Sequence, residues 1–160
     1  MRDVEAKLNI EGTFSSEEEL AETIRSRRIC YDTEPYYTTA KGQLVQIGYQ
    51  INLYGTFPQA DKKPSPDDRE FRKVLQDVRK VAEALSNTCD PLHMCESTIE
   101  DSNTISYSHD RKMRADVTVH IPVFDQQNFG HPVNRHIEET VGLAGKILEA
   151  AGVRRKHWED

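Results

Sequence analysis

The sequence predicts an α+β fold: one largely antiparallel sheet with helices packed on one of its faces. Several segments alternate apolar and polar residues, which is typical of half-buried strands. Others repeat apolar residues at three-and-four spacing, which is typical of helices lying on a sheet. Short turns join most strands, and this favours antiparallel pairing. The 160 residues suit a single domain, 1–160. The predicted element order is β-α-β-β-α-β-β-α.

The first strand and the first helix are predicted within residues 4–27. Apolar and polar side chains alternate over residues 4–10, which predicts a strand. Ser15 and Ser16 precede three glutamates, and this pattern predicts a capped helix that runs to about Arg27. Its inward face is predicted to consist of Leu20, Ala21 and Ile24.

A hairpin is predicted over residues 29–53. Its first strand contains Pro35, which cannot donate a ladder hydrogen bond and therefore suits an edge. Residues 40–42 suit the turn, because Gly42 accepts the positive φ of tight hairpin loops. Strict alternation on the second strand predicts five apolar side chains on one face: Val45, Ile47, Tyr49, Ile51 and Leu53.

The second helix is predicted to begin at Ser65 and Pro66, with serine as cap and proline in the first turn. Residues 87–91 are predicted to end this helix. Its inward stripe is predicted to be Phe71, Val74, Leu75, Val78, Ala82 and Leu85.

Two more strands are predicted within residues 96–108 and 112–124, joined by a tight turn at 109–111. This register places Tyr107 opposite Met113, and Glu100 opposite His120. The last helix is predicted over residues 133–151, with Gly152 as its C-cap. Its inward residues are predicted to be Ile137, Val141, Ala144, Leu148 and Ala151.

Charge and composition narrow the classes of function. The net charge of −6 repels phosphate backbones, so nucleic acid is not expected as a partner. The basic run 154–156 is interpreted as a solvated helix terminus. No apolar run reaches the length of a bilayer span, so no membrane partner is expected. Three cysteines and no recognisable export signal favour a cytoplasmic location.

Cys89, His93 and Cys95 form the one group that resembles a set of zinc ligands. Their spacing is not that of common zinc motifs, and no second cysteine pair closes a site. Buried cysteines commonly serve as small apolar residues. The packing interpretation is therefore preferred, and no metal or cofactor is expected.

A second group lies on the polar face of the strand within residues 112–124. Arg114, Asp116, Thr118 and His120 are spaced two apart and share that face. With Glu100 opposite His120, a carboxylate and an imidazole form a candidate acid–base pair, and Asp116 is a third candidate catalytic group. The competing interpretation is ordinary opposite-charge pairing on an exposed sheet.

A third group, His131 and Arg135, precedes or opens the last helix. Free amides and the dipole at a helix start attract anions, so these two residues join Arg114 and Thr118 as candidate ligand-binding residues. Neither a dinucleotide-binding fingerprint nor a phosphate-binding loop motif is present.

The sequence therefore favours a binding or self-association domain without a recognisable catalytic motif. Its polar sheet face must meet solvent, a ligand or another subunit. A homodimer is expected, because two-fold pairs are the commonest oligomers. Two alternatives remain open: a small-molecule enzyme that uses Glu100, Asp116 and His120, and an acidic inhibitor or immunity-type protein that binds a basic protein. The predicted dimer contacts are Gln50, Asn52, Thr118 or His120.

Overall fold

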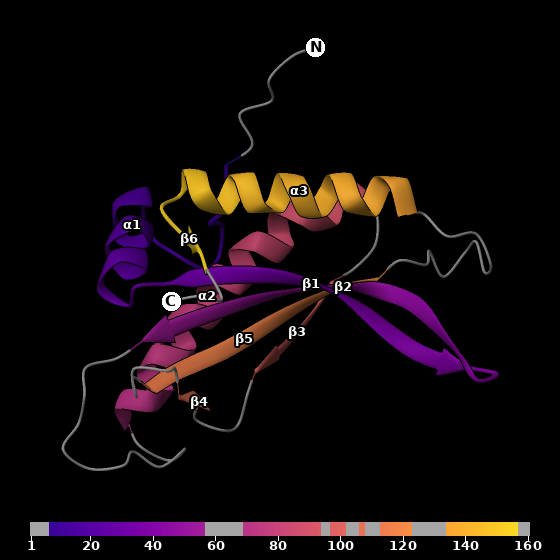
Figure 1. The fold of residues 1–160 in the computed structure, drawn as a ribbon. Helices are drawn as coiled ribbons and strands as arrows, with labels where there is room; N and C mark the ends of the chain where they lie inside the picture. The colour runs from indigo at the N-terminus through magenta and orange to yellow at the C-terminus, as the bar shows by residue number, and fades with distance from the viewer. Residues whose placement is uncertain are drawn as a thin grey trace.

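The computed structural model describes residues 7–56, 69–93, 97–101, 106–107, 113–122 and 134–156. The fold is α+β, as predicted, with helices packed against a single sheet (Figure 1). In chain order the elements are α1 (Glu17–Ser26), β1 (Cys30–Ala40), β2 (Gln43–Thr56), α2 (Arg69–His93), β3 (Thr98–Asp101), β4 (Ser106–Tyr107), β5 (Met113–Pro122), α3 (Asn134–Ala150) and β6 (Arg154–Arg155).

The sheet is mixed, which corrects the prediction of a largely antiparallel one. Its strands lie in the order β3-β5-β2-β1-β6, and β4 also pairs with β5. β6 runs parallel to β1, with Cys30 beside Arg154 and Tyr31 beside Arg155, whereas the other pairings are antiparallel. The basic run 154–156 is therefore not a helix terminus. Two arginines without apolar alternation carry no period-two signal, so the sequence could not predict this strand.

The predicted element order is not confirmed, because residues 7–10 form no strand. Leu8 is buried and Ile10 packs against the core, so the alternation marks burial correctly. The amide of Asn9 donates to Oγ1 of Thr88 at 2.8 Å, so a side chain of α2 takes the place of a ladder partner. The first part of the predicted strand lies outside the described residues.

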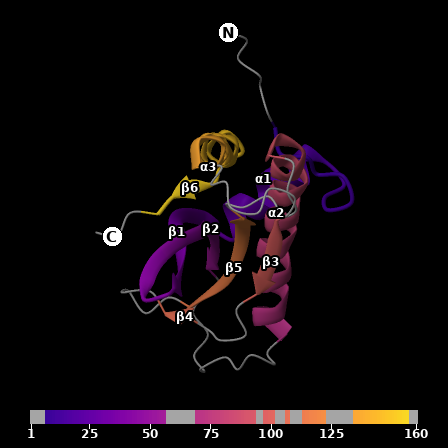
Figure 2. The ribbon, with the colours of Figure 1, turned by 90° about the vertical axis from the view of Figure 1, so that its right-hand side faces the viewer.

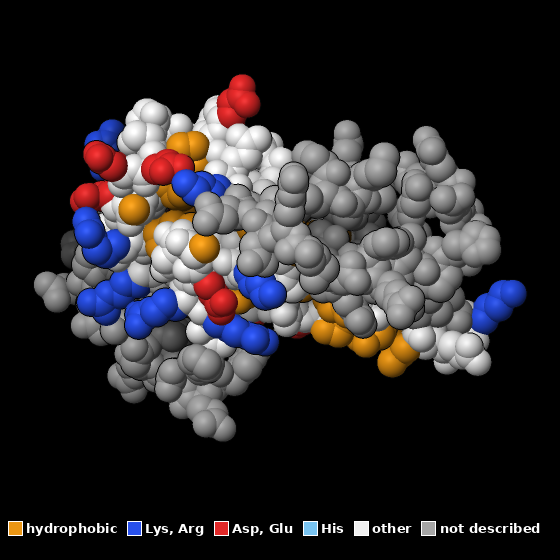
Figure 3. All heavy atoms as spheres, turned by 90° about the horizontal axis from the view of Figure 1, so that it is seen from above, with side chains coloured by type: hydrophobic (Ala, Val, Ile, Leu, Met, Phe, Trp, Pro, Cys, Tyr) orange, Lys and Arg blue, Asp and Glu red, His pale blue; other side chains and the backbone are white. Residues whose placement is uncertain are grey.

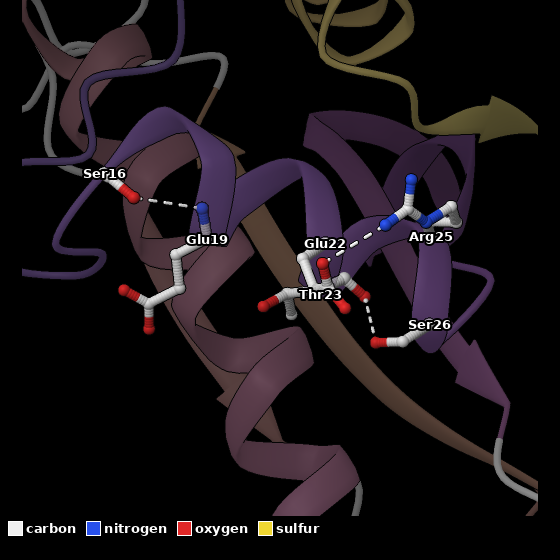
Figure 4. A network of polar contacts seen from close by, with 6 residues as sticks. All are labelled: Ser16, Glu19, Glu22, Thr23, Arg25 and Ser26. Atoms are coloured by element: carbon white, nitrogen blue, oxygen red, sulfur yellow. Dashed lines mark hydrogen bonds and ion pairs between the residues drawn. The ribbon is translucent and has the colours of Figure 1, made fainter.

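Helix α1 begins at the predicted cap (Figure 4). Ser16 is the N-cap, and its Oγ accepts from the amide of Glu19 at 3.1 Å. Leu20 and Ile24 are buried as predicted, whereas Ala21 is exposed. The chain leaves the helix through Arg28, whose φ of 50° is left-handed.

Helix α2 is longer than predicted, because residues 87–91 continue it instead of ending it. Two contacts with neighbouring backbone hold this region. Oγ1 of Thr88 donates to the carbonyl of Ala84 at 2.7 Å, and Nδ2 of Asn87 donates to the carbonyl of Glu11 at 3.4 Å. A bond within the helix and contacts with the distant segment 9–11 thus override the local breaking signal. The predicted start at Ser65 and Pro66 lies outside the described residues, and the predicted stripe is buried except for Leu75, which is partly buried.

Helix α3 agrees closely with its predicted range and C-cap. Gly152 has a φ of 102°, its amide donates to the carbonyl of Glu149, and the amide of Val153 donates to the carbonyl of Leu148. This pair of bonds is typical of a glycine-terminated helix. Val141, Ala144 and Leu148 are buried and Ala151 is partly buried, while the side chain of Ile137 lies outside the described residues.

The β1–β2 hairpin turns at Lys41 and Gly42, both with positive φ, between the paired residues Ala40 and Gln43. The predicted turn is thus confirmed. A bulge shifts the register between Tyr36 and Tyr37, so the predicted alternation over residues 45–53 is not continuous. Tyr49, Ile51 and Leu53 pack toward the core as predicted, and the side chains of Val45 and Ile47 lie outside the description. At Pro35, β2 is the only strand of the described chain that pairs with β1. The predicted edge position of Pro35 is thus confirmed.

The hairpin extends past the other described strands, because the last described pair between β2 and β5 joins Gly48 and Pro122 (Figure 1). We call residues 36–47 the hairpin arm. Figure 2 shows the sheet strongly curved, with α2 running along β3 and β5 and α3 lying over β1 and β2. In the described part of the chain, every helix is too short or too polar to span a bilayer.

Helix α2 approaches the sheet at Gly55. A Cβ atom added there would lie 2.4 Å from Cγ2 of Val78 and 3.3 Å from Cγ1 of Val74. Only glycine lets the helix pack this closely against β2. Val78 and Val74 are completely buried, and they belong to the core between α2, α3 and the sheet.

Candidate functional site

The face of the sheet opposite α2 and α3 is polar, and we call it the open face. Strand alternation and the pairing register bring side chains of four strands to it. They are Asp32, Glu34 and Tyr36 of β1, Gln50, Asn52 and Tyr54 of β2, Thr98 and Glu100 of β3, and Arg114, Asp116, Thr118 and His120 of β5. The four polar residues predicted to share one face of β5 therefore do so.

The centre of the open face is a hydrogen-bonded network around Asn52. Nδ2 of Asn52 donates to Oδ1 of Asp32 at 2.7 Å and to Oε1 of Glu34 at 3.0 Å. Its Oδ1 accepts from Oγ1 of Thr118 at 2.8 Å. Asp32 is 6% exposed and Asn52 is 8% exposed, so these bonds satisfy groups that water hardly reaches. The network stabilises the sheet and leaves Asn52 little capacity for a ligand.

Tyr54 joins this network, and its ring makes cation–π contacts with two basic side chains. Its hydroxyl donates to Oδ2 of Asp32 at 2.8 Å. The guanidinium of Arg114 lies 4.5 Å from the ring centroid, and Nζ of Lys156 lies 4.6 Å from it. Burial raises the pKa of Tyr54 well above its ordinary value, and the bond to Asp32 raises it further. The phenol therefore stays protonated and acts as a donor.

Arg114 and Asp116 form an ion pair, with Nε of Arg114 3.2 Å from Oδ1 of Asp116. Both side chains are about four-fifths buried. The carboxylate of Asp116 is therefore engaged by a guanidinium on its own strand. Of the three candidate catalytic residues, Asp116 does not join the other two in one cluster.

Glu100 and His120 do meet: Nε2 of His120 lies 3.0 Å from Oε2 of Glu100. The predicted register is wrong at this point, because Thr98 lies opposite His120 and Glu100 lies opposite Thr118. A shift of two residues keeps every side chain on its face, so the pair still forms along a diagonal. The ring of Tyr36 lies edge-on to His120 with centroids 5.6 Å apart.

The register error begins between β3 and β4. Tyr107 pairs with Met113 as predicted, whereas Asp101 pairs with Val117. Four residues lie between Asp101 and Ser106 on this side, but two lie between their partners Val117 and Arg114. The register therefore differs by two residues between the described residues Asp101 and Ser106. The alternation of apolar residues cannot reveal an even-numbered insertion, because it leaves the faces unchanged.

The remaining predicted groups do not form a described site. Cys89 is completely buried in the hydrophobic core, as expected for a packing residue. The side chain of His93 and all of Cys95 lie outside the description, as do His131 and the side chain of Arg135. Within the described residues no cluster of three or more histidine, cysteine or acidic side chains is arranged to hold a metal ion.

The sequence alone did not identify Asp32, Glu34 and Tyr36, which are the side chains that β1 contributes to the open face. Their spacing of two within a predicted strand was the available signal. It also missed Lys156 and Cys30, which β6 brings together. Burial raises the pKa of the Cys30 thiol despite the nearby charges of Lys156 and Arg114. No sequence signal connects residues so far apart in the chain.

No known protein family matches the chain, and no curated protein is significantly similar to it.

Proposed function

We propose that this chain is a binding domain that associates with a second copy of itself through the hairpin arm and the adjoining part of the open face. The observation that carries the proposal is exposure of large apolar side chains on the arm. Tyr36 is 42% exposed, Tyr37 is 49% exposed and Leu44 is 76% exposed. Figure 3 shows hydrophobic side chains at the surface toward the hairpin end of the molecule. Exposed apolar groups gathered in one place are typical of interaction surfaces.

The register puts these side chains on both faces of the arm. Tyr37 lies opposite Gln46, and Thr39 lies opposite Leu44, so Tyr37 and Leu44 are diagonal neighbours on one face. Tyr36 points to the other face, where its ring meets His120. An arm with apolar groups on both faces suits a contact in which a partner packs against both faces. Packing on the chain's own sheet would cover one face only.

A face-to-face contact fits better than strand addition along β1. The carbonyl of Tyr31 accepts from the amide of Lys156, so the backbone groups of Tyr31 point away from β2. Alternate residues after Tyr31 direct their backbone groups to the same side, which is the edge of the sheet beyond β6. Pro35 is one of them, and it has no N–H to offer an added strand. Gln50 and His120 adjoin the arm and supply polar contacts, whereas Asn52 and Thr118 support the surface from within their network.

Sedimentation equilibrium over micromolar concentrations tests the proposal. The wild-type chain is expected to reach the mass of a dimer. Leu44→Glu and Tyr36→Glu place a charge on an exposed arm position and are expected to weaken the dimer about tenfold or more, because an unpaired charge then enters an apolar contact. His120→Glu is expected to weaken it if the open face takes part.

Gln76→Glu is the matched control, since it adds the same charge to an exposed position of α2. It is expected to leave the dissociation constant unchanged. A strictly monomeric wild-type chain at all concentrations contradicts self-association. A dimer that tolerates Leu44→Glu and Tyr36→Glu contradicts the assignment to the arm.

The pairing of His120 and Glu100 favours acid–base catalysis as a second candidate function. Their separation of 3.0 Å suits proton exchange between a carboxylate and an imidazole. Catalysis also needs a concave pocket around the pair. The two pockets lined by described residues lie elsewhere, one beside α1 and one between α3 and β1. Hydrolysis of p-nitrophenyl esters that falls equally in His120→Gln and Glu100→Gln would support it.

The inhibitor alternative, with a basic protein as partner, has less support. An acidic binding surface needs its carboxylates in one patch. On the described open face, Arg114, Lys156 and His120 lie among Asp32, Glu34, Asp116 and Glu100. The cytoplasmic location remains part of the proposal, supported by the half-buried thiol of Cys30 and the core position of Cys89.

A further inference from the structure

A pocket of about 300 Å³ opens between α3 and β1, on the side of the sheet away from the open face. Neither the hairpin arm nor the His120–Glu100 pair borders it. The pocket lies next to β6, where β1 loses its parallel neighbour after Tyr31. Its lining consists of Tyr31 and Thr33 of β1, Val141, Gly142, Gly145, Lys146 and Glu149 of α3, and Arg155 of β6.

The floor of the pocket is fixed by Tyr31, which is 4% exposed. Its hydroxyl donates to Oε1 of Glu149 at 3.0 Å. A Cβ atom added at Gly145 would lie 2.9 Å from that hydroxyl oxygen, so glycine is needed where the phenol passes beneath the helix. The floor is therefore rigid, with one hydrogen-bond donor already committed to the helix.

The rim of the pocket is predominantly basic. Lys146 and Arg155 are exposed cations from two different elements, and Glu149 is the acidic residue that accompanies them. The bond from Tyr31 engages one oxygen of Glu149. Arg155 is close enough to lower the pKa of Tyr31 against the larger effects of burial and Glu149. Its positive potential therefore reaches the floor.

The opening of the pocket is provided by Gly142. A Cβ atom added there would meet nothing within 4 Å, so this turn of α3 borders empty space. The volume falls at the lower end of the range of small-molecule pockets. The hydroxyl of Thr33 and the guanidinium of Arg155 are suitable donors to an anion's oxygens.

We propose that the pocket between α3 and β1 binds a small organic anion, whose carboxylate or phosphate group is held by Lys146 and Arg155 above the Tyr31–Glu149 floor. Arginine offers a planar fork that matches the oxygens of either group, and lysine adds a point charge. A site of this kind lies apart from the arm, so a ligand and a second copy of the chain can bind together.

Backbone-amide NMR of the full chain tests the site, with inorganic phosphate and acetate as separate probes and sodium chloride as the ionic-strength control. Saturable shifts are expected at Gly142, Gly145 and Lys146 with one or both probes, and not with chloride. The stronger probe distinguishes a phosphate group from a carboxylate group. Arg155→Ala is expected to weaken binding about tenfold, the effect of losing one charge-assisted hydrogen bond.

Arg154→Ala is the matched control, because it removes the same charge from the neighbouring exposed position of β6. It is expected to change the affinity less than about twofold. Gly142→Leu places a side chain at the opening, where its Cβ meets no atom within 4 Å, and is expected to abolish the shifts while leaving the melting temperature unchanged or higher. Equal losses in Arg154→Ala and Arg155→Ala, binding that survives Gly142→Leu, or no saturable shift with either probe would overturn the proposal.

Discussion

At the scale of single residues, Arg28 has a left-handed backbone conformation that costs conformational energy and that the sequence does not predict. Its φ of 50° ends α1, while its amide donates to the carbonyl of Arg25 and the amide of Ile29 donates to the carbonyl of Ile24. The same bonding pattern ends α3, where Gly152 occupies the corresponding position. A left-handed conformation costs a residue with a side chain about 1–2 kcal/mol, whereas glycine adopts it freely.

Arg28→Gly is therefore expected to stabilise the chain by about 0.5–1 kcal/mol, after the larger entropy of unfolded glycine is deducted. Urea unfolding measures the change as a shift of the midpoint. Arg25→Gly, inside the same helix and also exposed, is the control and is expected to destabilise by about 1 kcal/mol. A lower midpoint in Arg28→Gly would contradict the strain argument.

Asn52 provides the second prediction at this scale. Replacing it with leucine leaves Asp32 without its 2.7 Å donor and the hydroxyl of Thr118 without its acceptor, in a region hardly reached by water. Asn52→Leu is expected to destabilise by about 2–3 kcal/mol, the scale for buried groups that lose their partners. Gln50→Leu, at the next open-face position of β2, is the comparison and is expected to change stability by less than about 1 kcal/mol. Equal effects in urea unfolding would refute the role of the network.

Local chemistry explains which residues the sequence predicts well. Ser16, Gly42 and Gly152 act through their own backbone neighbourhood, so their roles follow from adjacent residues alone. The Asn52 network joins β1, β2 and β5, and its bonds depend on a pairing register that adjacent residues do not determine. The predicted open face was correct as a surface, but its internal bonding could not be predicted.

At the scale of elements, the contact of α2 with β2 depends on Gly55. Gly55→Ala forces a methyl group to within 2.4 Å of Cγ2 of Val78 and is expected to destabilise by about 2–3 kcal/mol through overpacking. Val78→Ala removes that methyl group and is expected to destabilise by about 1–3 kcal/mol through a cavity. The double variant is expected to be more stable than the sum of the two losses predicts, by about 1 kcal/mol or more.

Urea unfolding of the wild type, the two single variants and the double variant measures this coupling. Gly55→Ala with Val117→Ala is the control pair, because Val117 is a buried valine that is not among the three nearest neighbours of an added Cβ at Gly55. Additive losses are expected in that pair. Additivity in the Gly55 and Val78 pair as well would show that the helix moves away from the sheet to relieve the contact.

The sequence predicts helices and strands correctly where the apolar periodicity is continuous. The predictions fail where contacts with residues distant in sequence determine the structure. The stripe of α2 was recognised from spacing alone, because all its members face the same sheet. The end of α2 was missed because Thr88 and Asn87 contact the segment 9–11, far away in sequence. The mixed character of the sheet was missed because β6 consists of two exposed arginines.

At the scale of the whole molecule, three weak acids that are buried or half-buried make the free energy of unfolding depend on pH in the alkaline range. Burial is the main cause of the raised pKa in Tyr54, Cys30 and Tyr31. Each group is neutral when protonated, so the folded state retains its proton longer than the unfolded state. The stabilisation is complete below the ordinary pKa values of 9.0 for cysteine and 10.0 for tyrosine. It is lost as the pH rises above them, because unfolding then releases protons.

The free energy of unfolding is therefore expected to fall steadily between about pH 9 and pH 11. Tyr54→Phe removes one of the three acids and is expected to give a shallower fall, although its stability near neutral pH is lower because the bond to Asp32 is gone. Tyr37→Phe, at an exposed position on the arm, is the control and is expected to keep the wild-type slope. Parallel slopes for Tyr54→Phe and the wild type would contradict the assignment.

The parallel pairing of β6 with β1 has a consequence for biosynthesis. β1 leaves the ribosome early, yet β6, which flanks it at Cys30 and Tyr31, is translated after every other described element. Until then the nascent chain displays the backbone groups of Tyr31, and the ring of Tyr54 lacks the ammonium of Lys156. Unpaired strand edges promote association between incomplete chains. A messenger RNA truncated before the codon for Arg154 still encodes every other described element. Its product is nevertheless expected to be bound by chaperones and degraded by proteases more than the chain that includes β6.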